Sequence, residues 1–163
     1  MSSYNSWDKV TASKLELGIQ KMPYIEKKPN PMMTAGLVAL KNRKLLLAFS
    51  NNKRAFYLPG GKTNRNETSQ AALIREMREE LNILINPDEL RFYTHIRVQA
   101  YGEKEGTIME QDCFIHDLKQ LPEPGAEIKR VHYFDSFSYS LESEQVPGVI
   151  ILMQQLKRDN LID

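Results

Sequence analysis

The stretch "GGKTNRNETSQAALIREMREELNI", residues 60 to 83, joins a glycine pair to a segment with helical periodicity. The apolar positions predict a helix from about Thr68 to Leu81, with Thr68 as its N-cap. The carboxylates of this stretch are Glu67, Glu76, Glu79 and Glu80. A chain that is nearly neutral overall therefore concentrates negative charge at one place.

The predicted helix has one acidic face and one apolar face. At about 100° per residue, Glu76, Glu79 and Glu80 fall within roughly 100° of arc. Like charges at this spacing repel one another, so a stable helix needs a counter-charge beside them. Oxygen ligands without His or Cys favour Mg²⁺ or Mn²⁺, although a solvated helix face would also explain the charges taken alone. The apolar face, suited to burial against a sheet, comprises Ile74, Met77 and Leu81.

The glycine loop before the helix is suited to an anionic group. Gly60 and Gly61, which follow Pro59, allow the backbone to approach a ligand closely. Lys62 and Arg65 come next, and the helix N-terminus adds its own positive potential. We therefore predict that Lys62 and Arg65 contact the phosphate of a phosphorylated substrate.

Composition limits the classes of function. The 163 residues include 22 Lys and Arg against 21 Asp and Glu, which gives no support for binding to a nucleic-acid polymer or an anionic membrane. A single cysteine, Cys113, excludes an internal disulfide and a Cys-based zinc cluster, and we expect it in the core. The apolar runs are too short to span a membrane and the N-terminus lacks a signal sequence, so we expect a cytoplasmic protein.

Periodicity along the rest of the chain predicts one mixed α/β domain. We expect an N-terminal extension over residues 1–32, packing on the domain or on a second subunit of a homodimer, and a domain over residues 33–163. The fold would be a sheet with helices on its faces rather than a regular βαβ series. The expected elements are a hairpin of strands 34–40 and 44–50, a strand at 55–59, a hairpin of strands 91–101 and 107–118, a strand at 128–134 and a helix at 146–160.

Residues 61–83 resemble the Nudix box, in which a glycine, a glutamate and an Arg-Glu-apolar-any-Glu-Glu motif recur at fixed spacing. Two positions differ, because Asn66 and Asn82 stand where the family commonly has glycine. Asparagine adopts the left-handed conformation readily, so we expect Asn82 to end the helix and neither change to abolish metal binding. The residues in register are Gly61, Glu67, Arg75, Glu76, Met77, Glu79, Glu80 and Ile83.

The resemblance implies the Nudix α/β/α sandwich with a mixed β-sheet. It also implies Mg²⁺- or Mn²⁺-dependent hydrolysis of a small nucleotide, a nucleoside diphosphate linked to another group X. Glu79 and Glu80 would be the principal metal ligands, with Glu76 as a further ligand or a base. The backbone carbonyl of Gly60 would be an additional ligand.

The resemblance also implies roles around these ligands. Arg75 and Glu67 would hold the carboxylates in place. Family members often recruit one more acid from outside the box as ligand or general base, and we expect Glu127 in this role, with Glu110 and Glu105 as alternates. The aromatic side chains that could stack on a base are Phe56, Tyr57, Tyr101 and Tyr133.

Several functions remain open at this point. The box serves nucleoside triphosphates, cleaved to a monophosphate and pyrophosphate, and also ADP-ribose or nucleotide sugars; the short chain slightly favours triphosphates. A Nudix domain that senses a nucleotide without catalysis is a second possibility, which the retained box acids disfavour. A prenyl diphosphate isomerase on the same fold would require a catalytic cysteine, and Cys113 lies in a predicted core strand.

Overall fold

The computed structural model describes residues 30–125 and 127–163, and the expected extension at residues 1–32 lies outside this part up to position 29. The described residues form two β-sheets, three α-helices and one short 3-10 helix, η1 (Pro87–Glu89). The α-helices are α1 (Ser69–Leu81), α2 (Ser136–Ser140) and α3 (Pro147–Arg158). The strands are β1 (Met32–Val38), β2 (Leu40–Lys41), β3 (Lys44–Ser50), β4 (Phe56–Tyr57), β5 (Gly60–Lys62), β6 (Arg91–Gln99), β7 (Ile108–Ile115) and β8 (Ile128–Phe134).

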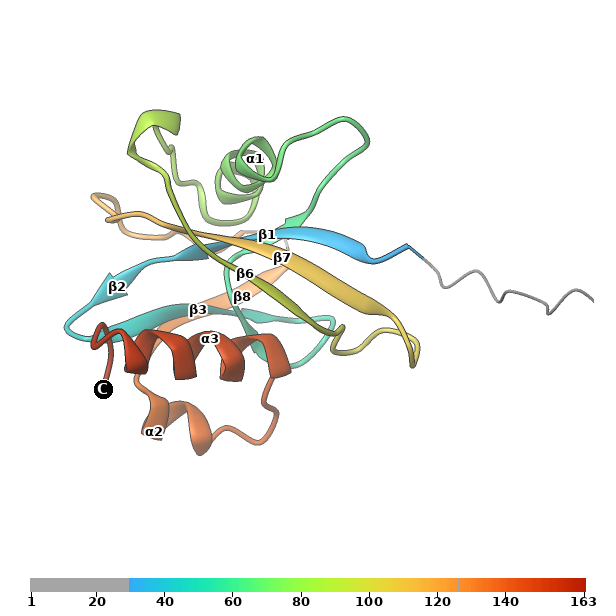
Figure 1. Cartoon of the computed structure of the whole chain (residues 1–163). Helices are drawn as coiled ribbons and strands as arrows, with labels where there is room; N and C mark the ends of the chain where they lie inside the picture. The colour runs from blue at the N-terminus through green and yellow to red at the C-terminus, as the bar shows by residue number, and fades with distance from the viewer. Residues whose placement is uncertain (1–29, 126) are drawn as a thin grey trace, which may run out of the picture.

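The two sheets differ in their strand directions. The first has the order β5-β1-β7-β6 and is mixed, because β1 and β7 are parallel while the other pairs are antiparallel. In the second, β3 pairs with β2, β4 and β8, all antiparallel. Helix α1 covers one side of the first sheet, and α3 lies on the opposite side of the molecule (Figure 1). The α/β/α layering with a mixed sheet, expected from the sequence, is confirmed.

Apolar side chains fill both spaces between these layers. Leu45 and Leu47 of β3 belong to the core that includes α3, whereas Leu46 belongs to the core beneath α1. Because both faces of the strand are covered, its sequence is a continuous apolar run rather than an alternating one. Cys113 is fully buried in the first of these cores, as predicted, and burial raises the pKa of its thiol to about 12.

The predicted hairpin of strands 34–40 and 44–50 is only partly correct. A two-residue turn at Asn42 and Arg43, with φ of 50° and 57°, joins β2 to β3. Strand β1 does not continue into this hairpin, and pairs instead with β5 and β7 of the other sheet. The chain passes between the sheets at Ala39, so the expected single sheet is in fact two.

The later elements agree more closely with the sequence. The second hairpin, the strand at 128–134 and the closing helix are confirmed as β6 with β7, β8 and α3. Three elements, η1, β5 and α2, were missed. Residues 60–62 form a short strand rather than a loop, and α2 begins with a capping box in which Asp135 accepts from the Ser138 backbone at 2.7 Å.

The ends of α1 are as predicted. The Thr68 hydroxyl accepts a hydrogen bond from the backbone N–H of Ala71 at 3.2 Å, which caps the first turn. Asn82 ends the helix in the left-handed conformation with φ of 53°, and Asn66 has φ of 63°. Both asparagines therefore adopt the conformation that glycine favours at such positions.

The buried face of α1 differs slightly from the prediction. Met77 and Leu81 are fully buried, but Ile74 is only half-buried. Ala72 and Leu73 complete the face that packs on the first sheet. The buried face of α1 is therefore centred closer to Leu73 than predicted. None of the helices in the described part of the chain is long and apolar enough to cross a membrane.

Candidate active site

The glycine pair brings β5 into close contact with β1. Gly60 has φ of +145°, and a Cβ atom there would lie 2.0 Å from the carbonyl oxygen of Ala35. The backbone N–H of Leu37 donates to the carbonyl of Pro59 at 2.7 Å, which fixes the entry to β5. No side chain fits at Gly60, so the backbone itself forms this wall of the site.

Gly61 makes the corresponding close contact with α1. A Cβ atom on Gly61 would lie 2.3 Å from the carboxyl carbon of Glu76. The side chain of Glu76 is only 15% exposed, because it packs directly against the loop backbone. The glycine pair thus determines where the first carboxylate of the helix can lie.

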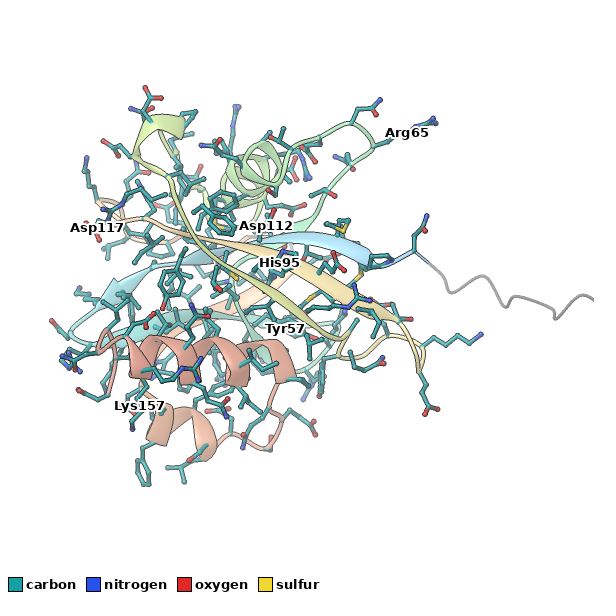
Figure 2. All side chains as sticks on the ribbon, in the orientation of Figure 1. Tyr57, Arg65, His95, Asp112, Asp117 and Lys157 are labelled. Carbon is teal, nitrogen blue, oxygen red and sulfur yellow. The ribbon has the colours of Figure 1, made fainter. Side chains whose placement is uncertain are left out.

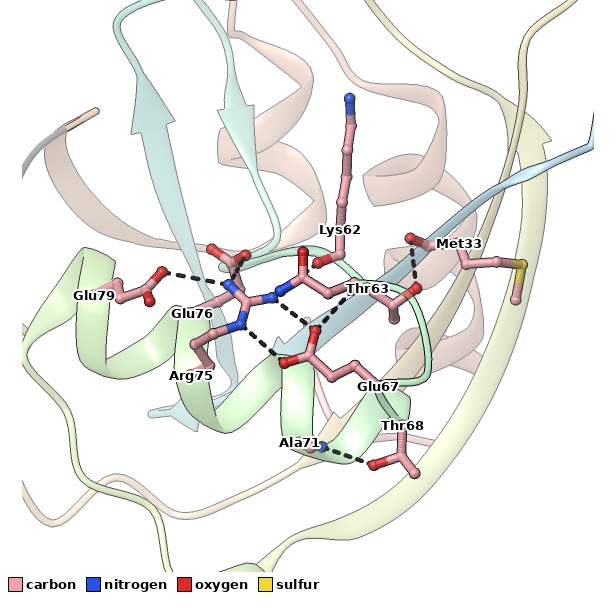
Figure 3. A network of polar contacts seen from close by, with 10 residues as sticks. Met33, Lys62, Thr63, Glu67, Thr68, Ala71, Arg75, Glu76 and Glu79 are labelled. Carbon is pink, nitrogen blue, oxygen red and sulfur yellow. Dashed lines mark hydrogen bonds and ion pairs between the residues drawn. The ribbon is translucent and has the colours of Figure 1, made fainter.

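Arg75 connects the carboxylates of the box (Figure 3). Its Nε and Nη2 each donate to one carboxylate oxygen of Glu67 at 2.9 Å, a bidentate pair. Nη1 donates to Glu76 at 2.6 Å and to Glu79 at 3.3 Å, while Nη2 also reaches the Lys62 carbonyl at 3.1 Å. One guanidinium therefore links the loop to the acidic face of α1.

The Glu67 carboxylate is held in its charged form. Hydrogen bonds from Arg75, and then from the backbone N–H of Asn64 at 2.8 Å, lower its pKa to about 2. The same contacts raise the pKa of Arg75 above its usual value. Glu67 and Arg75 thus remain ionised at any pH at which the protein would work.

Glu80 has a different environment from the other glutamates of the helix. It lines a cavity of about 160 Å³ together with Gly60, Gly61, Lys62 and Glu127. Burial, and then the charges of Glu76, Glu127 and Glu79, raise the pKa of Glu80 to about 7. Negative charge is therefore in excess at this end of the cavity.

A divalent cation fits this set of donors. Several carboxylate oxygens near one cavity wall are the ligands that Mg²⁺ and Mn²⁺ prefer, and a cation would relieve the repulsion that raises the Glu80 pKa. Within residues 30–125 and 127–163, however, no three acidic, His or Cys side chains converge closely enough to hold a metal in this conformation. Glu76 and Glu79 are both paired with Arg75 instead, and Glu79 is 60% exposed.

The candidates for an additional acid lie in different places. Glu127 lines the same cavity as Glu80, immediately before β8. Glu110 does not line it, because Met109 and Gln111 are the β7 residues that face the cavity, and Glu110 between them pairs with Arg97. Glu105 is exposed in the turn between β6 and β7, away from the cavity. Glu127 is thus the only one of the three that the tertiary structure brings to the box.

The two predicted phosphate contacts also separate. Lys62 lines the same cavity as Glu80. Arg65 lies at the outer end of the loop between β5 and α1, where its side chain points into solvent (Figure 2). In this conformation the two cations do not share one site.

Of the four aromatic candidates for base stacking, two lie at the cavity. Tyr57 lines it, as well as an adjoining cavity of about 40 Å³ that Tyr101 also lines. The rings of Tyr57 and Tyr101 pack edge to face with centroids 6.0 Å apart. The Tyr57 hydroxyl is buried and has no hydrogen-bond partner among the described residues. Phe56 and Tyr133 pack elsewhere, in the two cores.

Two polar residues of the cavity wall were not among the predicted site residues. Lys53 lies in the turn after β3 and lines both cavities. Gln111 does so too, in contact range of the Gly36 backbone. A signal for Gln111 was present, because strand alternation places this polar residue on the same face as the apolar Met109 and Cys113. Nothing local to Lys53 distinguishes it from other turn lysines.

Comparison with known proteins gives a consistent result. The family model described as the NUDIX domain matches residues 30–147. A search of curated protein sequences found no match.

Solved structures share the fold at low identity. The MutT protein from Methanosarcina mazei Go1 has a TM-score of 0.66 and 16% identity, over 82% of this chain and 97% of that one. An Ap4A hydrolase binary complex from C. elegans has a TM-score of 0.60 and 16% identity, over 79% and 97%. A bifunctional NMN adenylyltransferase/ADP ribose pyrophosphatase from Francisella tularensis, complexed with AMP and a Mn ion, has a TM-score of 0.58 and 23% identity, over 90% and 45%. At these identities the similarity shows a shared fold and nothing further.

Proposed function

The chain belongs to the Nudix hydrolase family, and on that premise we propose that it hydrolyses the diphosphate linkage of a nucleoside diphosphate attached to a further group X. The single observation that carries this proposal is the environment of Glu80. The residue combines burial, three neighbouring carboxylates and a raised pKa in a cavity lined by the glycine pair and a lysine. Such a concentration of negative charge is unfavourable unless a cation and an anionic ligand complete it.

The residues that would hold the cation are Glu76, Glu79 and Glu80, with the Gly60 carbonyl as a further ligand. The donor set favours Mg²⁺ or Mn²⁺. When bound, such a cation lowers the pKa of a water and neutralises charge on the diphosphate oxygens. The chain's own side chains would position the carboxylates, bind the substrate phosphate and accept the proton.

Arg75 and Glu67 position the acidic face. Because Arg75 already contacts Glu76 and Glu79, it sets how far those carboxylates can turn toward Glu80. Glu67 in turn fixes the guanidinium through two parallel hydrogen bonds. Lys62 lines the same cavity as Glu80 and would bind a phosphate oxygen of the substrate.

Glu127 is the proposed general base. It lines the cavity and forms no ion pair with the described residues. Its charge contributes to the raised pKa of Glu80. Glu127 would accept the proton of the water that attacks phosphorus. The P–O bond of the anhydride breaks at the same time, and the phosphate leaves with the electron pair. Tyr57 and Tyr101, in the adjoining cavity, would contact the base or the group X.

Two substrate classes are consistent with this site. We favour nucleoside triphosphates, hydrolysed to a monophosphate and pyrophosphate, because the described domain is small and holds no second substrate-binding unit. ADP-ribose and nucleotide sugars are the alternative class. A sensor without catalysis is disfavoured because Glu67, Glu76, Glu79 and Glu80 are all retained.

The test is a screen of nucleotides and nucleotide sugars with Mg²⁺ and with Mn²⁺, with phosphate measured after a coupled phosphatase. For the best substrate, Glu80→Gln should lower kcat by about a thousandfold or more, because loss of a ligand removes charge stabilisation from the transition state. Glu105→Gln, an equal change of charge on an exposed turn, should retain activity. Calorimetry with Mg²⁺ should show weakened binding only for the first variant, and near wild-type turnover in Glu80→Gln would refute the metal assignment.

A further inference from the structure

Two lysines from different segments contact one carboxylate at the edge of the cavity. Lys53 lies in the turn between β3 and β4, and Lys62 is the last residue of β5. Their ammonium groups lie 3.0 Å and 3.7 Å from the same oxygen of Glu103, in the turn between β6 and β7. Both lysines also line the cavity that contains Glu80. The paired cations therefore lie within the candidate active site.

The side chain of Lys53 is held in place by its neighbours. Its ammonium group lies 5.6 Å from the centre of the Tyr57 ring and donates to the carbonyl of Tyr101 at 3.2 Å. Gly102, with φ of +69°, leaves room for its methylene groups, since a Cβ atom there would lie 3.3 Å from the Lys53 Cδ. At 30% exposure, this lysine is not a freely moving surface cation.

The ionisation of Glu103 depends on its contacts with the same two lysines. The hydrogen bond from Lys53, followed by its charge and that of Lys62, lowers the pKa of Glu103. The neighbouring Tyr101 is anchored separately, because its hydroxyl donates to Glu144 at 2.6 Å. The turn that carries Glu103 is thus attached to the lysines on one side and to the segment before α3 on the other.

A carboxylate bound by two cations is the kind of ligand that a phosphate can replace. A phosphate group carries more negative charge and more acceptor oxygens than Glu103, so it would bind the same lysines more strongly. We propose that Lys53 and Lys62 form a phosphate-binding pair for the substrate, and that Glu103 is the internal counter-ion that a substrate phosphate displaces. This inference rests on the proposed function only in taking the phosphate to be that of the substrate.

The test measures binding without catalysis. Inorganic pyrophosphate is titrated into the full chain by calorimetry at low salt, in a buffer with a chelator so that no divalent cation is present. Glu103→Gln should bind pyrophosphate about two- to fivefold more tightly than wild type, because an internal competitor of ordinary ion-pair strength is removed. Lys53→Met should weaken binding by at least a similar factor.

Matched controls come from the same turn. Glu105→Gln removes an equal charge two residues away, and Lys104→Met removes a cation next to Glu103; both residues are exposed and neither contacts the lysine pair. Both controls should leave the affinity within about 1.5-fold of wild type, since exposed charges at a distance are largely screened. Thermal unfolding of each variant confirms that it is folded.

Three results would overturn the proposal. Equal effects of Glu103→Gln and Glu105→Gln would mean that only overall charge matters. Weaker binding in Glu103→Gln would mean that Glu103 positions the lysines rather than competing for them, and absence of pyrophosphate binding in every variant would remove the site altogether. Because no turnover is measured, these results leave the hydrolase proposal untouched. A chain that binds pyrophosphate as expected but hydrolyses no nucleotide would refute the hydrolase proposal alone.

Discussion

A Cβ atom on Gly61 would lie 2.3 Å from the carboxyl carbon of Glu76, so the glycine loop and the acidic helix meet without room for a side chain. The contact is between a backbone and the end of a flexible side chain. A substitution at Gly61 should therefore displace the carboxylate rather than the fold.

For Gly61→Ala we expect kcat to fall about 10- to 100-fold, because a shift of the order of 1 Å in a catalytic group has this effect. The midpoint of thermal unfolding should change little, because Glu76 can turn away. Steady-state kinetics on the substrate found by the screen, beside a thermal melt, checks both halves. Wild-type turnover would show that the position of Glu76 is not critical.

Gly60→Ala, unlike Gly61→Ala, should destabilise the fold. A Cβ atom would lie 2.0 Å from the Ala35 carbonyl oxygen, and the φ of +145° is itself unfavourable for alanine. We expect the free energy of unfolding in urea to fall by about 2–4 kcal/mol. Gly125→Ala is the control, since its Cβ would have only ordinary contacts, at 3.8 and 3.9 Å. It should change stability by less than about 0.5 kcal/mol.

Arg75→Lys should impair the site although the charge is kept. Lysine cannot make the bidentate pair with Glu67 while also reaching Glu76. Loss of such a supporting contact lowers metal affinity or activity about 10- to 100-fold. Mg²⁺ titrations of kcat measure the effect. Arg78→Lys provides the comparison, because Arg78 is exposed on the same helix and has no ion pair within the described part of the chain.

Asp135 should give stability that depends on pH. The backbone N–H of Ser138, and then Lys44 at 2.9 Å, lower the pKa of this carboxyl. A lowered folded-state pKa stabilises the protein above the unfolded pKa of about 3.9, and this contribution is lost as the pH falls through the folded-state value. Asp135→Asn keeps an N-cap acceptor and removes only the charge.

The wild type should therefore be more stable than Asp135→Asn at pH 6, and the difference should shrink as the pH falls below about 4. Urea unfolding of both proteins from pH 7 to pH 2.5 measures it. A difference that stays constant across this range would mean that the ionised carboxylate contributes nothing beyond its role as a cap.

Much of the site could be predicted because its signals are local. The helix of the box, its Thr68 cap and the left-handed Asn82 follow from residues within a few positions of one another, and the structure confirms all three. The match to the family likewise confirms the resemblance carried by residues 61–83. The supporting role that the resemblance gave to Arg75 and Glu67 stays a prediction, and the structure adds that the two side chains bond to each other.

The residues that complete the site are less evident from local signals. Glu127 was expected only as one of three candidate acids, and Lys53 and Gln111 were not among the predicted site residues. Glu127, Lys53 and Gln111 reach one cavity from different strands, and a lysine in a turn or a glutamate before a strand has no local feature that tells where its side chain will lie. The departure of β1 from the expected hairpin has the same origin, because the pairing of a strand depends on partners distant in sequence.

By itself, the sequence determined the helix, its caps and the carboxylates that it carries, because backbone hydrogen bonds and side-chain periodicity act over a few residues. Only the tertiary structure decided which of those carboxylates is buried, which is paired with Arg75, and which groups from other strands lie opposite them. Burial and charge are properties of everything packed around a residue, and strand pairing across the two sheets brings together groups that are far apart in the chain.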